Sequence, residues 1–110
     1  MALGGRKAVA PQDALRAILR ERRLEAGLTQ DQLAFLAGYD RSAVIRIENG
    51  ERIPQLPTIL NLCTVLRIHP ATVIKQLSDA IGFEILSESR IKQMLDAERR
   101  GRPPKRYSDR

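Results

Sequence analysis

The chain lacks most of the residues from which metal centres and disulfide frameworks are built. Its 110 residues include one cysteine, Cys63, one histidine, His69, and no tryptophan. A single cysteine excludes an intramolecular disulfide framework and a cysteine-rich zinc site, and a single histidine leaves no pair for a histidine-based metal site. We therefore expect no metal, no cofactor and no enzymatic activity.

Long apolar runs are absent as well. The longest stretches without charge, such as residues 53–66, are shorter than the roughly 20 apolar residues that a membrane span needs. Residues 1–10 carry Gly4 and Gly5 and lack the apolar core of a signal peptide. We expect a cytoplasmic protein with no membrane contact. Its four aromatic residues are too few for a protein that binds single strands by stacking.

Positive charge is abundant but unevenly placed. The net charge is +6, and residues 99–110 alone hold six basic side chains and one acidic one. Residues 1–86 are nearly balanced, with 11 basic and 9 acidic side chains. Such a tail either binds a polyanion or only aids solubility, and charge alone leaves both interpretations open.

The apolar spacing predicts an all-α fold built on one domain. The apolar positions of a first helix start at Leu15, a fourth helix begins at about Leu56, and Pro70 suits the first turn of a fifth. Ser87 or Ser89 is the candidate cap of a sixth helix that carries Ile91, Met94 and Leu95. Phe35 and Phe83 are expected to pack. The predicted inward positions of the first helix are Leu15, Ile18, Leu19 and Ala26, and those of the second are Leu33, Ala34, Leu36 and Ala37. Those of the fourth helix are Ile59, Leu62, Cys63 and Leu66, and those of the fifth are Val73, Ile74, Leu77 and Ile81.

The second helix has the clearest start. Thr29 followed by Gln32 forms a capping box, and Leu28 with Leu33 forms the matching hydrophobic staple. The helix ends at Gly38, and Asp40 is the candidate cap of a third helix that ends near Asn49. Two short helices joined by a tight turn are the geometry of a helix-turn-helix.

The residues of this region extend the pattern. The run Arg23-Leu-Glu-Ala-Gly-Leu-Thr-Gln-Asp-Gln-Leu-Ala, then Gly38, Ile47-Glu-Asn-Gly50 and Pro54, resembles the Xre-type family of lambda repressor and Cro-like domains. The resemblance implies a five-helix lambda-repressor-like domain that binds double-stranded operator DNA, usually as a homodimer. Accordingly we expect a flexible basic arm over residues 1–10, the DNA-binding domain over 11–82, a helical extension over 83–100 and a basic, disordered tail over 101–110.

The third helix is the expected recognition helix. Its outward face is Arg41, Ser42, Ile45 and Arg46, opposite the inward Val44 and Ile47. Arginine pairs best with guanine O6 and N7. Ile45 departs from the family, which usually has a small polar residue there; it either touches a thymine methyl or tucks against a neighbouring helix.

The resemblance also assigns roles outside that face. It implies phosphate contacts for Gln30, which begins the second helix, and for Asn49 and Arg52 after the recognition helix. Gln55 stands where the family often has serine and is a fourth phosphate candidate. Arg23 and Glu48 match the family's internal ion pair, for which we expect a structural role.

The tail carries a second motif. The run Arg100-Gly-Arg-Pro-Pro-Lys-Arg106 resembles an AT-hook. Gly101 would let the backbone approach the groove floor, and Pro103 with Pro104 would hold the segment extended. Arg100 and Arg102 would enter the minor groove of A·T-rich DNA, while Lys105, Arg106 and Arg99 would meet phosphates. The alternative is an unspecific basic tail.

These features together predict a sequence-specific DNA-binding transcriptional regulator, a repressor, associated with the nucleoid when it is bound to DNA. The apolar residues of 83–100 predict a surface for dimerisation, for docking on the fold or for another protein. Two alternatives remain open. One is an antitoxin-type protein whose C-terminal part binds a toxin, and the other is an architectural protein of A·T-rich DNA.

Overall fold

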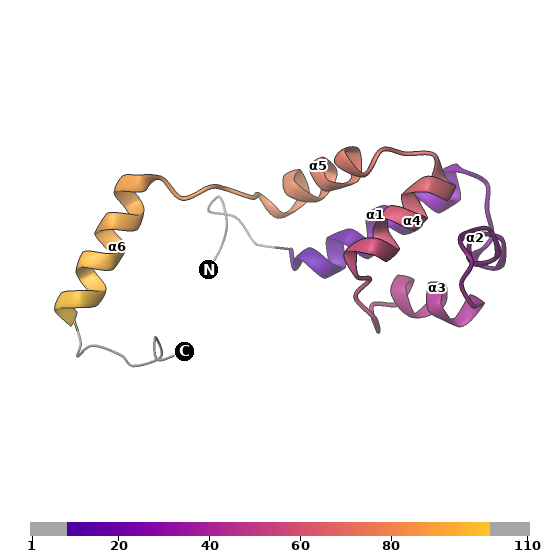
Figure 1. Cartoon of the computed structure of the whole chain (residues 1–110), viewed down its shortest axis with the longest axis horizontal. Coiled ribbons are helices and arrows are strands. Elements are labelled where there is room, and N and C mark those ends of the chain that lie inside the picture. The colour runs from indigo at the N-terminus through magenta and orange to yellow at the C-terminus, as the bar shows by residue number, and fades with distance from the viewer. Residues whose placement is uncertain (1–8, 102–110) are drawn as a thin grey trace.

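A computed structural model of the chain describes residues 9–101 and shows six α-helices there and no strand (Figure 1). None of these helices has the length and apolar character needed to cross a membrane. The helices are α1 (Pro11–Glu25), α2 (Gln30–Ala37), α3 (Arg41–Glu48), α4 (Leu56–Leu66), α5 (Pro70–Ile81) and α6 (Glu88–Gly101).

The first five helices share one apolar core. Helix α1 packs against α5 and α3, and α2 packs against α3 and α4 (Figure 1). Val73 of α5 and Cys63 of α4 are its most completely buried side chains. All four inward positions predicted for α4 are buried, as expected from their helical spacing: Ile59, Leu62, Cys63 and Leu66.

The helix starts follow the capping signals of the sequence. The Thr29 hydroxyl accepts a hydrogen bond from the Gln32 backbone N–H at 3.0 Å, and the Gln32 side chain accepts one from the Thr29 N–H at 2.9 Å. The expected capping box of α2 is therefore confirmed. Asp40 occupies the N-cap position of α3, but its side chain makes no capping bond. The Ser87 hydroxyl accepts a bond from the Arg90 N–H, so Ser87 starts α6.

Helix α1 begins at Pro11, because proline is well suited to a first helical turn. Several residues that were expected to lie inward or to pack are exposed instead. Phe35, expected to pack, is 82% exposed, and Leu36 also points away from the core. An eight-residue helix wedged between two neighbours buries only a narrow side. The other residues expected inward or packed but found exposed are Ala26, Ile74 and Phe83.

Helix α6 stands apart from the other five (Figure 1). It buries none of its residues, so the expectation that this segment docks on its own domain is wrong. A 14-residue helix needs an apolar contact area on its neighbours, and residues 83–87 lead α6 away from them. Gly101 closes α6, so the expected irregular tail cannot begin at residue 101.

Candidate nucleic-acid interface

Helices α2 and α3 are joined by a short turn that glycine makes feasible. Gly38 has φ of 80°, in the left-handed region, and the next N–H, that of Tyr39, donates to the Ala34 carbonyl at 2.8 Å. Asp40 then precedes the first residue of α3. The neighbouring Asn61 and Thr58 side chains lower the pKa of Tyr39. The Asn61 Nδ2 donates to the Ala37 carbonyl at 2.8 Å, and this bond ties the turn to α4. The turn therefore fixes α3 relative to both neighbouring helices.

Helix α3 divides cleanly into a buried and an open side. Val44 and Ile47 are buried, whereas Arg41, Ser42 and Arg46 are exposed. Ile45 is half-buried. The Arg41 Nε lies 3.3 Å from the Asp31 Oδ1 in an exposed ion pair that reaches back to the first turn of α2. Two guanidinium groups and a hydroxyl are thus presented on one side of a helix that is two turns long.

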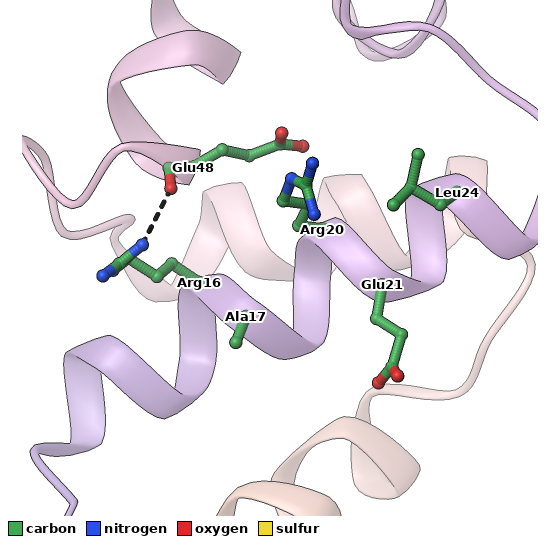
Figure 2. A pocket seen from close by; sticks show the side chains of 6 residues that line it. All are labelled: Arg16, Ala17, Arg20, Glu21, Leu24 and Glu48. Atoms are coloured by element: carbon green, nitrogen blue, oxygen red, sulfur yellow. Dashed lines mark hydrogen bonds between the residues drawn. The ribbon is translucent and has the colours of Figure 1, made fainter.

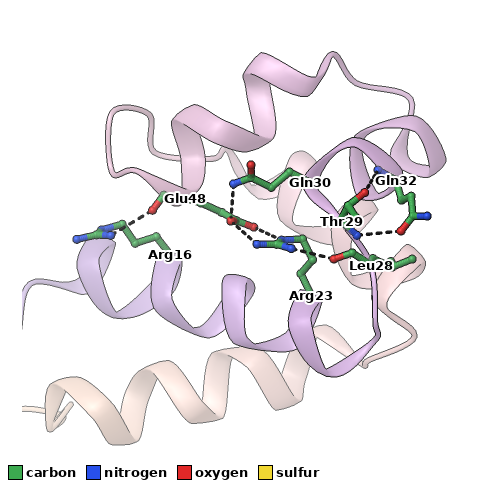
Figure 3. Close-up of polar contacts among 7 residues, drawn as sticks. All are labelled: Arg16, Arg23, Leu28, Thr29, Gln30, Gln32 and Glu48. Atoms are coloured by element: carbon green, nitrogen blue, oxygen red, sulfur yellow. Dashed lines mark hydrogen bonds and ion pairs between the residues drawn. The ribbon is translucent and has the colours of Figure 1, made fainter.

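The buried end of α3 is held by a two-point ion pair. The Arg23 Nε lies 2.6 Å from the Glu48 Oε2, and its Nη2 lies 2.9 Å from the Glu48 Oε1 (Figure 3). Both residues are 6% exposed. The hydrogen bonds to Glu48 raise the pKa of Arg23, and the opposite charge adds to this against the effect of burial. The two residues implied as partners therefore join α1 to α3.

Gln30 belongs to the same cluster. Its Nε2 donates to the Glu48 Oε1 at 2.9 Å, and the Arg23 Nη1 donates to the Leu28 carbonyl at 2.8 Å (Figure 3). The described part of the chain contains no buried side-chain nitrogen or oxygen without a hydrogen-bond partner. The carboxylate of Glu48 thus collects donors from α1 and from α2, and it fixes the start of α2 against the end of α3.

Arg16 is a further member of the cluster that the sequence did not reveal to us. Its Nη1 donates to the backbone carbonyl of Glu48 at 3.1 Å, in the last turn of α3 (Figure 2). A cation there satisfies an end carbonyl and opposes the negative end of the helix dipole. A detectable signal existed, because Arg16 and Arg23 are seven residues apart and hence share one face of α1.

A surface hollow of about 560 Å³ lies beside this contact (Figure 2). It offers no thiol, hydroxyl or imidazole, and no group of three or more His, Cys, Asp or Glu in residues 9–101 is placed to hold a metal ion. The hollow is a surface groove that lies along α1 and reaches Glu48 at the end of α3. The lining residues are Arg16, Ala17, Arg20, Glu21, Leu24 and Glu48.

The segment after α3 carries the remaining candidates. Asn49 is the C-cap of α3, and the Arg52 N–H donates to the Arg46 carbonyl at 3.2 Å. Gln55 is the N-cap residue of α4, and its side chain makes no capping bond. All three side chains are exposed. The segment from α3 to α4 therefore leaves two amides and one guanidinium open to a ligand.

The tail motif is only partly described. Arg100 and Gly101 lie in the last turn of α6. Arg100 falls within the helical extension expected over residues 83–100, whereas Gly101 is helical where an irregular tail was expected. The other motif residues, Arg102, Pro103, Pro104, Lys105 and Arg106, fall outside the described residues.

Known proteins share the region that contains these features. The profile of the helix-turn-helix family matches residues 19–73, which is half of the chain. An uncharacterized HTH-type transcriptional regulator of Methanothermobacter thermautotrophicus is 43% identical over 42 residues, which are 38% of this chain and 61% of that regulator. The chain thus spans less than two thirds of the length of that relative.

Solved structures extend the similarity to the fold. The restriction-modification controller protein C.AhdI from Aeromonas hydrophila is 43% identical, with a TM-score of 0.56, over 59% of this chain and 98% of that one. The clp gene regulator ClgR from Corynebacterium glutamicum has a TM-score of 0.63 over 86% of this chain and 98% of its own, and at 19% identity it shows the fold alone. With helices α2 and α3 joined by their glycine turn, the match over residues 19–73 shows that the chain belongs to the helix-turn-helix family.

Proposed function

We propose that the protein is a sequence-specific transcriptional regulator, a repressor, that places α3 in the major groove of double-stranded DNA. The observation that carries the proposal is the division of α3, with Val44 and Ile47 buried and Arg41, Ser42 and Arg46 exposed. A recognition helix needs one side anchored in the fold and the other side free to meet base edges. The matches to a transcriptional regulator and to a restriction-modification controller support the same role.

Each exposed side chain of α3 has a matching base chemistry. The two guanidinium groups of Arg41 and Arg46 suit the O6 and N7 acceptors of guanine, and the Ser42 hydroxyl suits a donor or an acceptor. Ile45 is half-buried and keeps part of its surface available to a thymine methyl. The helix therefore combines polar readout with one apolar contact.

The flanking residues are proposed to bind the phosphates. Gln30 opens α2, where the first backbone N–H groups have no acceptor inside the helix. One amide N–H of Gln30 already serves Glu48, and the second remains for a phosphate oxygen. Asn49, Arg52 and Gln55 are exposed after α3 and would hold the other side of the groove.

We also propose that the protein binds as a homodimer with half-sites about 10 bp apart. Beyond the domain, the tail would act as an AT-hook, with Arg100 at the end of α6 and Arg102 next along the chain. A hook adds affinity in A·T-rich minor grooves, whose width and negative potential suit arginine. Base reading stays with α3.

Two alanine variants test the main proposal. Once selection from random DNA has defined the preferred site, Arg41→Ala and Arg46→Ala are each expected to weaken specific binding by about 1–3 kcal/mol. Lys75→Ala is the matched control, because it removes one exposed positive charge from α5. Competition titrations against unrelated DNA measure the discrimination. If both α3 variants discriminate as well as the control, α3 does not read the bases.

A second candidate function follows from α6. Its exposed apolar side chains favour an antitoxin-type protein whose C-terminal helix binds another protein. Co-purification of a second protein in fixed stoichiometry from the native source would favour that function. Equal affinity for all A·T-rich sequences would instead favour an architectural protein.

A further inference from the structure

Helix α6 carries an apolar stripe that nothing in the described chain covers. Ile91, Met94 and Leu95 follow helical spacing on one side of the helix, and they are 42%, 47% and 53% exposed. A 14-residue helix with one alanine is marginal in water when it is alone, so a partner along this stripe would stabilise α6. Leu86 and Ile85, just before the helix, are exposed as well.

The charges along one edge of the stripe indicate which partner fits. Glu88 and Arg99 are eleven residues apart, close to three full turns, so they lie on the same edge, and Lys92, one turn after Glu88, adds a second positive charge to it. The midpoint of the two charges along the helix axis falls between Gln93 and Met94, and each charged residue lies about 8 Å from it. An edge with a negative end and a positive end is complementary to itself when it is turned end for end.

From this symmetry we propose that α6 pairs antiparallel with α6 of a second copy of the chain. The inference rests on the proposed homodimer and specifies its interface. Two identical edges face each other only when the helices run in opposite directions. Glu88 of each copy then meets Arg99 of the other, so a single interface contains the ion pair twice. Ile91 of one copy faces Leu95 of the other, and the two Met94 side chains meet near the twofold axis.

The pairing is compatible with DNA binding by both copies. Helix α6 stands apart from α1–α5, so joining two copies through it leaves Arg41 and Arg46 uncovered (Figure 1). The Asp96 Oδ1 lies 3.7 Å from Arg99 within the same helix, at a highly exposed site, so Arg99 can turn towards a second copy at little cost.

Charge reversal tests both the partner and the direction. In sedimentation equilibrium, Glu88→Arg and Arg99→Glu should each raise the dimer dissociation constant by about tenfold, because two attractive pairs become repulsive. The double variant should return it to within about threefold of the wild-type value. Loss of helix propensity could not produce that rescue. A wild-type chain that stays monomeric, single variants that dimerise as tightly as wild type, or a double variant without rescue each overturns the proposal.

Cross-linking gives a second measurement. Met94→Cys should form covalent dimers with a short bis-maleimide, whereas Gln93→Cys, on the opposite side of the helix, should not. The native Cys63 is 1% exposed and contributes no background. Equal cross-linking at positions 93 and 94 would overturn the antiparallel interface.

Failure of the α6 interface and failure of the proposed DNA-binding function would give different results. If α6 does not pair, the Arg41 and Arg46 variants still lose discrimination on a single half-site, and the proposed function stands. If the α6 variants behave as expected but the wild-type dimer discriminates no DNA sequence, the proposed function fails and the α6 interface stands.

Discussion

Arg23 and Glu48 form a two-point ion pair that is nearly closed to solvent and joins α1 to the last turn of α3. Gln30 brings α2 to the same carboxylate, and Arg16 holds the backbone carbonyl of Glu48. The helix proposed to read DNA is therefore held by three side chains, two from α1 and one from α2, which all form hydrogen bonds with Glu48. Such fixation keeps the exposed side of α3 in one orientation, as recognition requires.

Breaking this pair from one side should be costly. Arg23→Met leaves Glu48 as a buried charge with one partner fewer, and we expect the free energy of unfolding to fall by about 3–5 kcal/mol. The double variant Arg23→Met/Glu48→Leu removes both charges and should lose clearly less. Urea unfolding measures the differences. Lys75→Ala, in an exposed pair with Asp79, is the control and should cost less than about 1 kcal/mol. A single variant as stable as this control would contradict the role of the pair.

Gly50 and Gly38 provide a matched comparison of strain. Their φ values are 82° and 80°, so alanine costs about 1–2 kcal/mol of stability at either position. An added Cβ at Gly50 would also lie 3.0 Å from the Arg16 Nε, whereas at Gly38 it meets nothing within 4 Å. Gly50→Ala should therefore cost more than Gly38→Ala and weaken the Arg16 contact to α3. Thermal unfolding compares them, and Gly50→Ala as the milder change would contradict the expectation.

Local signals in the sequence account for most of the helices. The capping box of Thr29 and Gln32 is formed by residues three apart, and the inward residues of α4 follow from helical period alone. Such features need no knowledge of the rest of the chain. The turn at Gly38 was predictable for the same reason, because few other residues accept its backbone conformation.

Features that depend on distant contacts were not predictable in this way. The helical periodicity of the apolar residues places Leu36 on the expected inward side of α2, but it does not show that α3 and α4 leave this side chain exposed. The contact between Arg16 and Glu48 spans 32 residues and involves a backbone carbonyl, so the shared face of Arg16 and Arg23 on α1 does not by itself identify its acceptor. The stripe of α6 likewise shows that a face is apolar without showing what covers it.

Cys63 should make stability depend on pH above neutrality. Burial raises the pKa of its thiol, so the folded protein keeps the proton when the unfolded chain begins to lose it near pH 8.5. This contribution is complete below that pH and declines as the pH rises further. The unfolding free energy of wild type minus that of Cys63→Ala should therefore shrink between pH 7 and 10. A constant difference would mean that the thiol ionises equally in both states.

Asp31 should restrain DNA binding. It pairs with Arg41 at an exposed site and adds a negative charge at the start of α2, where a phosphate is expected. Asp31→Asn should tighten binding to all sequences by about two- to fivefold, with unchanged discrimination. Asp79→Asn makes the same charge change on α5 and should have a smaller effect. Fluorescence anisotropy at fixed salt compares the two, and equal gains would show only a change in net charge.

The tail can be tested apart from the domain. Removal of residues 102–110, which leaves α6 and Arg99 in place, takes away four basic side chains and one acidic one, so overall affinity should fall while sequence preference remains. The slope of log affinity against log salt should flatten by roughly 0.9 for each phosphate that the shortened protein no longer neutralises. A generic basic tail would behave in this way on any DNA.

An AT-hook predicts an effect that depends on the base composition of the flanking DNA. Arg102→Ala should cost more affinity on sites flanked by A·T-rich DNA than on G·C-rich flanks, because the guanine amino group blocks the floor of the minor groove. Arg110→Ala removes the same charge outside the motif and should cost the same on both flanks. Titrations of both variants on both DNAs at one salt concentration measure the loss of affinity for each of the four pairs of variant and DNA. Equal losses for Arg102→Ala on the two flanks would reduce the tail to electrostatic attraction and remove the hook from the function of this protein.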